Sequence, residues 1–398
     1  MKKISAVLLV SLSAYYLQGQ TFIQAYKNRA DQVSQANITA NLQGFENLGV
    51  KTTGSANNTA ALNWLKNKYT AYGYTASQMA EDPFSFNSGS GTVNSKNLII
   101  TKTGTLYPNT YVIICAHYDT VAGPGVNDNG SGTSILLEAA RILKDVPTEY
   151  SIKFIHFSGE EQGLYGSRHY ANNVAYQNNN RVLDIKLVFN IDEVGGQLGN
   201  NNNTIKCERD VSGSSSNNAM SNQITQELAT CTTLYSPLQT VISNAYSSDY
   251  MPFENKNEVI TGFFENIESN RPHTSSDTFA NVDPVYVYKI GKAAVGALQH
   301  FASASSSTNN VLGTGEVHAE HSLDAVKIYP NPAKDVLHLE IPRNISNFHV
   351  DISDMSGRMI LNSENQNTIN ISGLADGVYM VTVKSYKETV TRKIIIEK

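Results

Sequence analysis

Hydrophobic residues between positions 20 and 302 fall into two kinds of pattern, short continuous runs and longer amphipathic stretches. The continuous runs lack polar alternation, which is typical of strands that are covered on both faces. They are Tyr111–Ala116, Ile152–Phe157, Leu187–Ile191 and Val259–Phe264. Helical stretches separate these runs, so the pattern predicts an α/β domain with a mostly parallel, mixed sheet flanked by helices.

Apolar residues at spacings of three and four predict three helices. They begin near Asn57, Thr133 and Asp283. Gly73 is expected to end the first helix, since glycine suits a helix C-terminus. Ser131 or Thr133 is expected to cap the second helix, and the Asp283–Pro284 pair is typical of a helix start.

The hydrophobic pattern changes after residue 302. Segment 303–324 is rich in Ser, Thr, Asn and Gly and has no period, which predicts a linker. From residue 325 to residue 398, apolar residues return at every second position in five short segments, which predicts a small antiparallel β-sandwich. The segments are 336–341, 349–352, 368–371, 378–383 and 393–396.

The N-terminus carries the features of an export signal. Lys2 and Lys3 precede the apolar stretch Ile4–Leu17, which is shorter than the ~20 residues of a membrane span. We therefore expect residues 1–19 to form a signal peptide and residues 20–302 to form the first folded domain. No other apolar run approaches membrane length, so we expect no transmembrane segment in the mature chain.

Composition narrows the set of partners. The chain has 30 basic and 35 acidic side chains, a net charge of -5, and it has no basic stripe, which excludes a nucleic-acid partner.

Its three cysteines are too few for a disulfide scaffold and lack the spacing of a thiolate metal site. Cys207 and Cys231 can pair only if they lie close together, which the sequence leaves open.

Candidate metal ligands follow the predicted strands, at the edge where ligands bind in open α/β sheets. They are His117, Asp128, Glu161, Asp192 and His273. Nitrogen and oxygen ligands without a thiolate suit zinc, with cobalt or manganese as substitutes. Two divalent cations ~3.5–4 Å apart need a shared anionic ligand. We expect Asp128 to be that bridge, with His117 and Asp192 on one metal and Glu161 and His273 on the other.

Further carboxylates near these ligands have other expected roles. Glu160 cannot point where Glu161 points, so it is free to take a proton from a metal-bound water and deliver it to a leaving amine. Asp119 is placed to accept a hydrogen bond from the far ring nitrogen of His117. Glu193, which follows Asp192 directly, is an alternative ligand, and Asp277 is expected to support or cap rather than to ligate. The Gly-rich loop 123–132 could suggest a phosphate-binding loop, but it lacks the lysine of such a loop, so we reject a phosphate-binding role.

Five segments in order resemble the secreted dizinc leucyl-type aminopeptidases and their exopeptidase relatives. The segments are 116–120, 125–132, 158–167, 190–192 and 273–278. The resemblance covers residues ~40–300 and implies the zinc-dependent exopeptidase fold, two zinc ions per chain and hydrolysis of N-terminal residues from peptides, with an expected apolar preference. It implies Asp128 as bridge, Glu160 as general base, Asp119 behind His117, and a cis peptide bond between Asp128 and Asn129.

One segment departs from the family pattern. Ser248–Tyr250 stands where relatives often carry Ser-Asp-His, so the substrate contacts of Asp249, Tyr250 and Phe253 are hypotheses, with the two aromatic rings expected to line the first specificity pocket. The alternatives on the same fold are a carboxypeptidase and a glutaminyl-cyclase-like acyltransferase with one zinc. A non-enzymatic surface binding protein is a third alternative, but it would have no need of Glu160.

The last 75 or so residues carry a second resemblance. Segments 328–332, 354–358, 374–379 and 393–396 resemble the C-terminal sorting domain of the bacterial type IX secretion system. This resemblance implies a partnership with the type IX machinery and passage across an outer membrane. It also implies removal of the tail and a final place outside a Gram-negative-type bacterium, either secreted or on its outer surface.

Overall fold

The computed structural model describes residues 20–398 except 213–216, 307–325, 342–347, 355–357 and 386–388. The expected signal peptide, residues 1–19, and most of the expected linker, residues 303–324, lie outside the described residues. The chain divides into two compact units, residues 1–308 and 309–398. Each unit is described by itself below.

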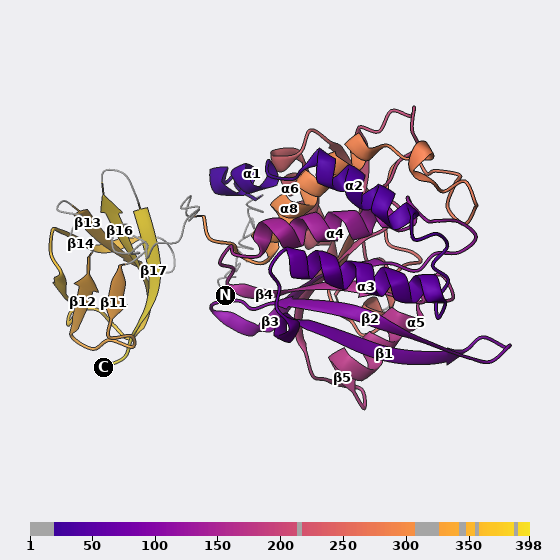
Figure 1. Cartoon of the computed structure of the whole chain (residues 1–398). Helices are drawn as coiled ribbons and strands as arrows, with labels where there is room; N and C mark the ends of the chain where they lie inside the picture. Colours follow the sequence, from indigo (N-terminus) through magenta and orange to yellow (C-terminus); the bar gives the residue numbers. More distant parts are fainter. Residues whose placement is uncertain (1–19, 213–216, 307–325, 342–347, 355–357, 386–388) are drawn as a thin grey trace, which may run out of the picture. The chain divides into compact units, whose positions relative to one another are not determined.

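The first unit is built on an eight-stranded sheet with the strand order β1-β2-β4-β3-β7-β10-β8-β9 (Figure 1). Its strands are β1 (Met79–Asn87), β2 (Thr92–Lys102), β3 (Tyr107–His117), β4 (Tyr150–Phe157), β7 (Asp184–Ile191), β8 (Thr204–Arg209), β9 (Gln239–Asn244) and β10 (Ile260–Glu265). The four central strands β4, β3, β7 and β10 are parallel to one another. The β1–β2, β2–β4 and β8–β10 pairs are antiparallel, which confirms a mixed sheet.

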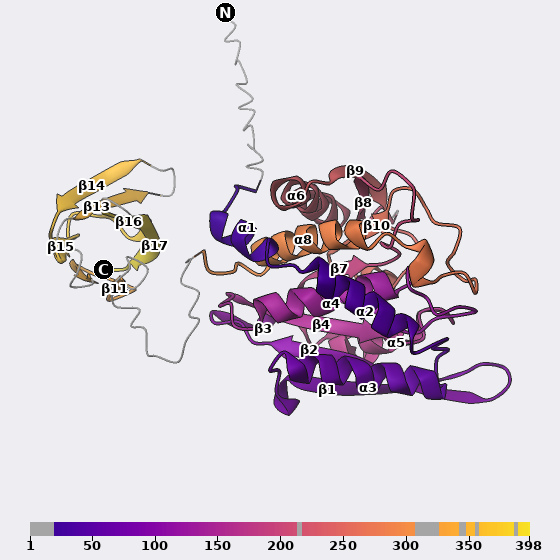
Figure 2. The ribbon, with the colours of Figure 1, turned by 45° about the horizontal axis from the view of Figure 1, so that its top comes forward.

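Helices cover both faces of this sheet, which explains why its strands read as continuous apolar runs. The helices are α1 (Gln24–Ala30), α2 (Gln35–Glu46), α3 (Ala56–Ala71), α4 (Gly130–Leu143), α5 (Tyr165–His169), α6 (Asn218–Tyr235), α7 (Met251–Glu254) and α8 (Pro284–Phe301), and a short hairpin joins β5 (Tyr176–Gln177) to β6 (Asn180–Arg181). In β3, Val112 and Ile114 pack into the core beneath α4 and α8, whereas Ile113 and Cys115 pack into a second core on the opposite face. Figure 2 shows α3 running beside β1 and β2.

The predicted C-terminus of α3 and the predicted N-terminus of α8 are confirmed, whereas the predicted N-cap of α4 is wrong. Gly73 follows α3 with φ +86°, a value that favours glycine, and Asp283 caps α8 by accepting hydrogen bonds from the first backbone N–H groups. Helix α4 begins earlier than predicted, with Asn129 as its N-cap. Ser131 and Thr133 lie inside α4, where their hydroxyls donate to the carbonyl oxygens of Asn127 and His117.

All three cysteines lie in the first unit, and all are buried free thiols. Cys115 is in β3, Cys207 in β8 and Cys231 in α6. The structure therefore resolves the open question of Cys207 and Cys231 in favour of unpaired thiols. Burial raises the pKa of both, so they remain protonated at neutral pH.

The second unit consists of two antiparallel sheets, with the orders β11-β12-β15 and β14-β13-β16-β17. The strands are β11 (Lys327–Tyr329), β12 (Val336–Glu340), β13 (Phe348–Asp354), β14 (Met359–Glu364), β15 (Thr368–Asn370), β16 (Gly377–Ser385) and β17 (Thr389–Ile396). Alternate side chains such as Leu337, Val350 and Val381 form one apolar core, as the period of two predicts. Across the described part of the whole chain, none of the helices is both long and apolar enough to cross a membrane.

Candidate metal centre

The candidate ligands meet at the carboxyl edge of the central parallel strands. His117 is the last residue of β3, Asp192 directly follows β7, and Glu161 lies in the loop after β4. Asp128 lies just before α4, and His273 lies in the long loop after β10. Because parallel strands end at one edge of a sheet, residues far apart in the sequence come together there.

Asp128 lies at the middle of this cluster. His117 Nε2 lies 3.0 Å from Asp128 Oδ1, and His273 Nε2 lies 3.1 Å from Asp128 Oδ2. His117 Nε2 also lies 3.3 Å from Asp192 Oδ1, while His273 Nε2 lies 3.0 Å from Glu161 Oε2. The structure thus brings all five predicted residues together, in the two predicted pairs on either side of one carboxylate.

The chemistry of this cluster fits divalent cations. Asp192 Oδ1 is buried and has no hydrogen-bond partner among the described residues. Burial raises the pKa of Glu161 to about 9, and the charge of Asp128 adds to this effect. The hydrogen bond with Asp128 raises the pKa of His273 to about 9. The cluster therefore retains protons because it holds an excess of buried negative charge, and cations bound by these donors would displace those protons.

Asp119 supports the cluster in a different way from the one predicted. His117 Nδ1 bonds to the backbone carbonyl of Asp119 at 3.1 Å, whereas the Asp119 carboxylate lies 3.8 Å from that nitrogen, too far for a hydrogen bond. The carboxylate instead accepts hydrogen bonds from the backbone N–H groups of Glu160 and Glu161, both at 3.3 Å, and from the hydroxyl of Thr53 at 3.0 Å. The backbone and side chain of Asp119 together orient His117 and the Glu160–Glu161 pair.

The loop that carries Asp128 is held by Asp277. The two oxygens of the Asp277 carboxylate accept from the backbone N–H groups of Asn127 at 2.7 Å and Asp128 at 3.0 Å. Asp277 therefore caps the loop, as expected, and lies behind Asp128. The peptide bond between Asp128 and Asn129 is cis, which confirms the expectation from the resemblance.

Ser248 also contacts the cluster, which was not predicted from the sequence. Its hydroxyl donates to Asp192 Oδ2 at 2.5 Å and accepts from the side-chain amide of Asn190 at 2.8 Å. This contact leaves Asp192 Oδ1 facing His117. Asp192 rather than Glu193 is therefore the carboxylate beside His117. In the sequence, only the Ser-Asp pair at 248–249 indicated that this segment contributes to the site.

The three predicted substrate contacts are fully buried. The exposed fraction is 0% for Asp249, 1% for Tyr250 and 0% for Phe253. The hydroxyl of Tyr250 donates to Glu208 Oε2 at 2.7 Å, and Phe253 packs in the core against Phe157. The prediction that these two aromatic rings line a substrate pocket is wrong, because they fill the second core beneath the sheet.

An accessible aromatic side chain lies nearby instead. Tyr246 is 58% exposed, and its ring packs edge-on against Phe264, with 6.1 Å between ring centroids. Partial burial raises the pKa of Tyr246 to about 12, and the neighbouring negative charge of Glu193 contributes to this effect. Tyr246 therefore lies close to the segment that carries Asp192. No motif marked it, because a lone tyrosine in a loop has no characteristic spacing.

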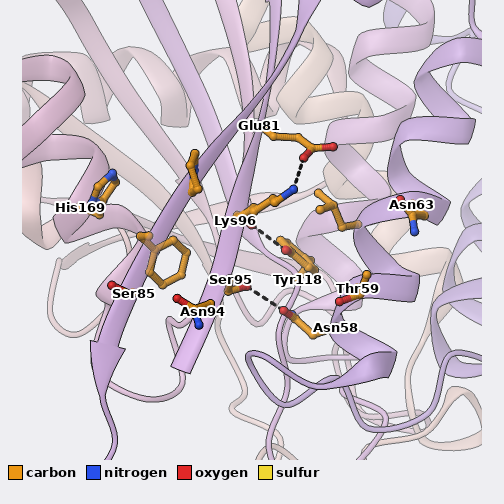
Figure 3. Close-up of a pocket in the computed structure, with 13 residues that line it drawn as sticks. Asn58, Thr59, Asn63, Glu81, Ser85, Asn94, Ser95, Lys96, Tyr118 and His169 are labelled. Atoms are coloured by element: carbon orange, nitrogen blue, oxygen red, sulfur yellow. Dashed lines mark hydrogen bonds and ion pairs between the residues drawn. The ribbon is translucent and has the colours of Figure 1, made fainter. Parts of the chain in front are cut away.

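A cavity of about 510 Å³ lies between α3 and the β1–β2 hairpin (Figure 3). It is lined by Asn58, Thr59, Leu62, Asn63, Glu81, Pro83, Phe84, Ser85, Asn94, Ser95, Lys96, Tyr118 and His169. The hydroxyl of Tyr118 donates to the carbonyl of Lys96, and the hydroxyl of Ser95 donates to Asn58 (Figure 3). None of the five candidate ligands lines this cavity.

Fold and cluster together define an α/β protein with a candidate dinuclear metal centre at the carboxyl edge of its sheet. Residues 97–298, half of the chain, match the model of peptidase family M28. The chain therefore belongs to peptidase family M28. Residues 327–397 match the model of the secretion system C-terminal sorting domain. Both resemblances noted in the sequence are confirmed by these matches.

Individual relatives agree with this assignment. Aminopeptidase YwaD of Bacillus subtilis is 46% identical over 103 residues, which are 25% of this chain and 22% of that protein. The chain thus matches only about a fifth of the length of that curated relative. Among solved structures, the LapA aminopeptidase of Legionella pneumophila has a TM-score of 0.60 at 22% identity, covering 76% of this chain and 80% of LapA. A glutaminyl cyclase of Macrostomum lignano has a TM-score of 0.61 at 16% identity, covering 76% of this chain and 97% of the cyclase. At these identities, LapA and the cyclase show only that this chain shares their fold.

Proposed function

We propose that this protein is a zinc-dependent aminopeptidase that hydrolyses N-terminal residues from peptides at a dinuclear centre. The observation that carries the proposal is the position of Asp128 between two imidazoles, each with its own second carboxylate. In this proposal Asp128 bridges two zinc ions. His117 and Asp192 hold one ion, and Glu161 and His273 hold the other.

The bound zinc ions would supply Lewis acidity and lower the pKa of water in the site. The chain itself supplies the proton carrier. Glu160 is held at its backbone N–H by Asp119, and burial raises the pKa of its carboxyl well above the usual range. Its position next to the ligand Glu161 leads to the proposal that the ionised Glu160 carboxylate accepts the proton of the attacking water and returns it to the leaving amine.

The aminopeptidase is favoured over the alternatives by the relatives and by the ligand set. The 46% identical relative is named an aminopeptidase, and the full set of five ligands suits two metals rather than the one of a glutaminyl-cyclase-like enzyme. A carboxypeptidase would use the same centre and is separated from this proposal only by the substrate. We propose Tyr246 instead of Tyr250 and Phe253 as an aromatic contact of the substrate, because it is exposed and lies near the segment of Asp192.

We further propose that the enzyme works outside the cell. The sorting-domain match supports export by the type IX machinery, with residues 1–19 as signal peptide and residues 325–398 as the sorting domain. Residues 20–302 then form the peptidase domain and residues 303–324 the linker. The division of the chain between residues 308 and 309 is compatible with that boundary.

The test is release of 4-nitroaniline from aminoacyl-4-nitroanilides by the purified mature protein, with and without a chelator. A Glu160→Ala variant is measured beside it, with Glu149→Ala, an acid remote from the centre, as the matched control. We expect both the chelator and Glu160→Ala to abolish release, and N-acetylated substrates to resist cleavage. Cleavage of N-acetylated peptides with no release from free-amine substrates would favour the carboxypeptidase instead.

A further inference from the structure

Glu265, the last residue of β10, is a fully buried carboxylate with no assigned role. Its side chain accepts three hydrogen bonds and donates none. Oε1 accepts from Asn127 Nδ2 at 3.2 Å and from the backbone N–H of Ser269, and Oε2 accepts from the backbone N–H of Gly196 at 2.7 Å. Every partner is a donor, so the position requires two acceptor oxygens.

Each of these three partners belongs to a segment that carries a candidate ligand. Asn127 directly precedes Asp128, Gly196 lies four residues after Asp192, and Ser269 lies four residues before His273. The side chain of Asn127 adds a further link, because its Oδ1 accepts from the backbone N–H of Gly195 at 2.6 Å. Glu265 therefore joins the loop of the proposed bridge to one terminal ligand of each metal.

The backbone of Glu265 strengthens the same connection. Its N–H donates to the carbonyl of Glu193 at 3.1 Å, next to Asp192. The two remaining ligands, His117 and Glu161, are oriented by Asp119. Asp119 thus serves His117 and Glu161, whereas Glu265 serves the segments of the other three ligands, alongside Asp277 at Asp128 and Ser248 at Asp192.

From this connectivity we infer that Glu265 is a positioning residue of the metal centre, which sets zinc affinity without touching zinc. The inference rests on the proposed function. Groups that orient metal ligands typically change metal affinity about 10–100-fold when they are mutated. Glu265 acts on the bridge and on a ligand of each ion, so the affinities of both ions depend on it.

The test is Glu265→Gln, which keeps the side-chain length but replaces one acceptor oxygen with an NH₂ group. That group must face a donor at one of the three contacts, which breaks the contact. Zinc affinity is measured by competition with a chromogenic chelator, and thermal unfolding of the metal-free protein is measured in parallel. We expect zinc affinity to fall about 10–100-fold, and a cooperative unfolding transition of the metal-free protein to show that the variant is folded.

Glu208→Gln is the matched control, because Glu208 is also a buried acid of the neighbouring strand but bonds to Tyr250 instead of a ligand segment. Equal zinc affinities of wild type and Glu265→Gln would overturn the inference, as would an equal loss in Glu208→Gln. If Glu265→Gln does not fold, Asn127→Ala removes one of the three contacts, and unchanged zinc affinity in that variant overturns the inference equally. A wild-type protein that binds no zinc would instead overturn the proposed function.

Discussion

The peptidase unit (residues 1–308) and the C-terminal unit (residues 309–398) both bury apolar cores against β-sheets, but they differ in what else they bury. The sheet of the peptidase unit buries many ionisable side chains, among them Asp119, Asp128, Asp192 and Glu265. In the described part of the C-terminal unit, every buried side chain is apolar. Burying a charge costs free energy unless it is paired, hydrogen-bonded or bound to a metal. The two units therefore differ in buried charge, because only the peptidase unit holds ionisable groups among the buried side chains that the structure describes.

The largest expected effect comes from removing the central carboxylate. Asp128→Ala deletes the group that lies between His117 and His273, so neither pair retains its shared anion. We expect activity to fall to background and zinc content, measured by elemental analysis, to fall below one ion per chain. Asp184→Ala, an exposed acid at the start of β7, is the control and should keep both. Retention of full activity by Asp128→Ala would refute the role of the bridge.

Metal removal should separate the two units in a thermal scan. Each zinc ion at 100 times its Kd stabilises the unit that binds it by about 2.7 kcal/mol, which corresponds to roughly 5–10 °C per ion for a domain of this size. We expect a chelator to lower the unfolding temperature of the peptidase unit alone, as followed by calorimetry. A shift of the C-terminal unit's transition would show that the comparison between the units is wrong.

Acid should also act on one unit more than on the other. Burial lowers the pKa of His156 from 6.5 to about 3, and its Nε2 is hydrogen-bonded to Tyr69. Because the unfolded chain takes up this proton at a higher pH than the folded one, stability is present above pH 6.5 and is lost as the pH falls toward 3. Chemical unfolding of His156→Gln should therefore show a shallower decline over this window. An unchanged pH dependence would mean that other groups dominate.

The smallest expected effect is that of removing the C-terminal unit. A chain that ends at residue 308 keeps every candidate ligand and the buried carboxylates Asp119, Asp277 and Glu265 that orient them. We expect kcat/KM on an aminoacyl-4-nitroanilide to stay within about twofold of the full-length value. A loss of ten-fold or more would assign the C-terminal unit a part in catalysis.

The ligand set could be predicted because it depends on residue types at the ends of strands, which the sequence shows directly. His117 and Asp192 each follow an apolar run, and the parallel sheet then brings them together. Five strands of the C-terminal unit, β12, β13, β15, β16 and β17, were predictable for a similar reason, since alternate side chains in them are buried. Strands β11 and β14 were not predicted, and neither contains a fully buried side chain. Strands β1, β2, β8 and β9 were not predicted. The patterns of β1 and β9 are largely polar and half exposed, and β2 and β8 carry polar residues among their apolar ones.

Apart from the capping role of Asp277, the contacts that orient the ligands could not be predicted, because they depend on the path of the backbone. The Asp119 carboxylate turns toward the N–H groups of Glu160 and Glu161, which no spacing reveals. Tyr250 follows a motif residue yet points into the core, because its hydroxyl finds a buried partner in Glu208. In the sequence, Glu265 looks like any residue at the end of a strand. Only the fold shows the three groups that donate hydrogen bonds to its carboxylate.

The most direct test of the central claim is anomalous diffraction at the zinc edge from crystals of the metal-loaded protein. The account predicts two zinc peaks, one on each side of Asp128, about 3.5–4 Å apart. His117 and Asp192 should contact one peak, and Glu161 and His273 the other. A single peak at full occupancy, with Asp128 bound to only that ion, would contradict the dinuclear centre and favour a one-metal enzyme on the same fold.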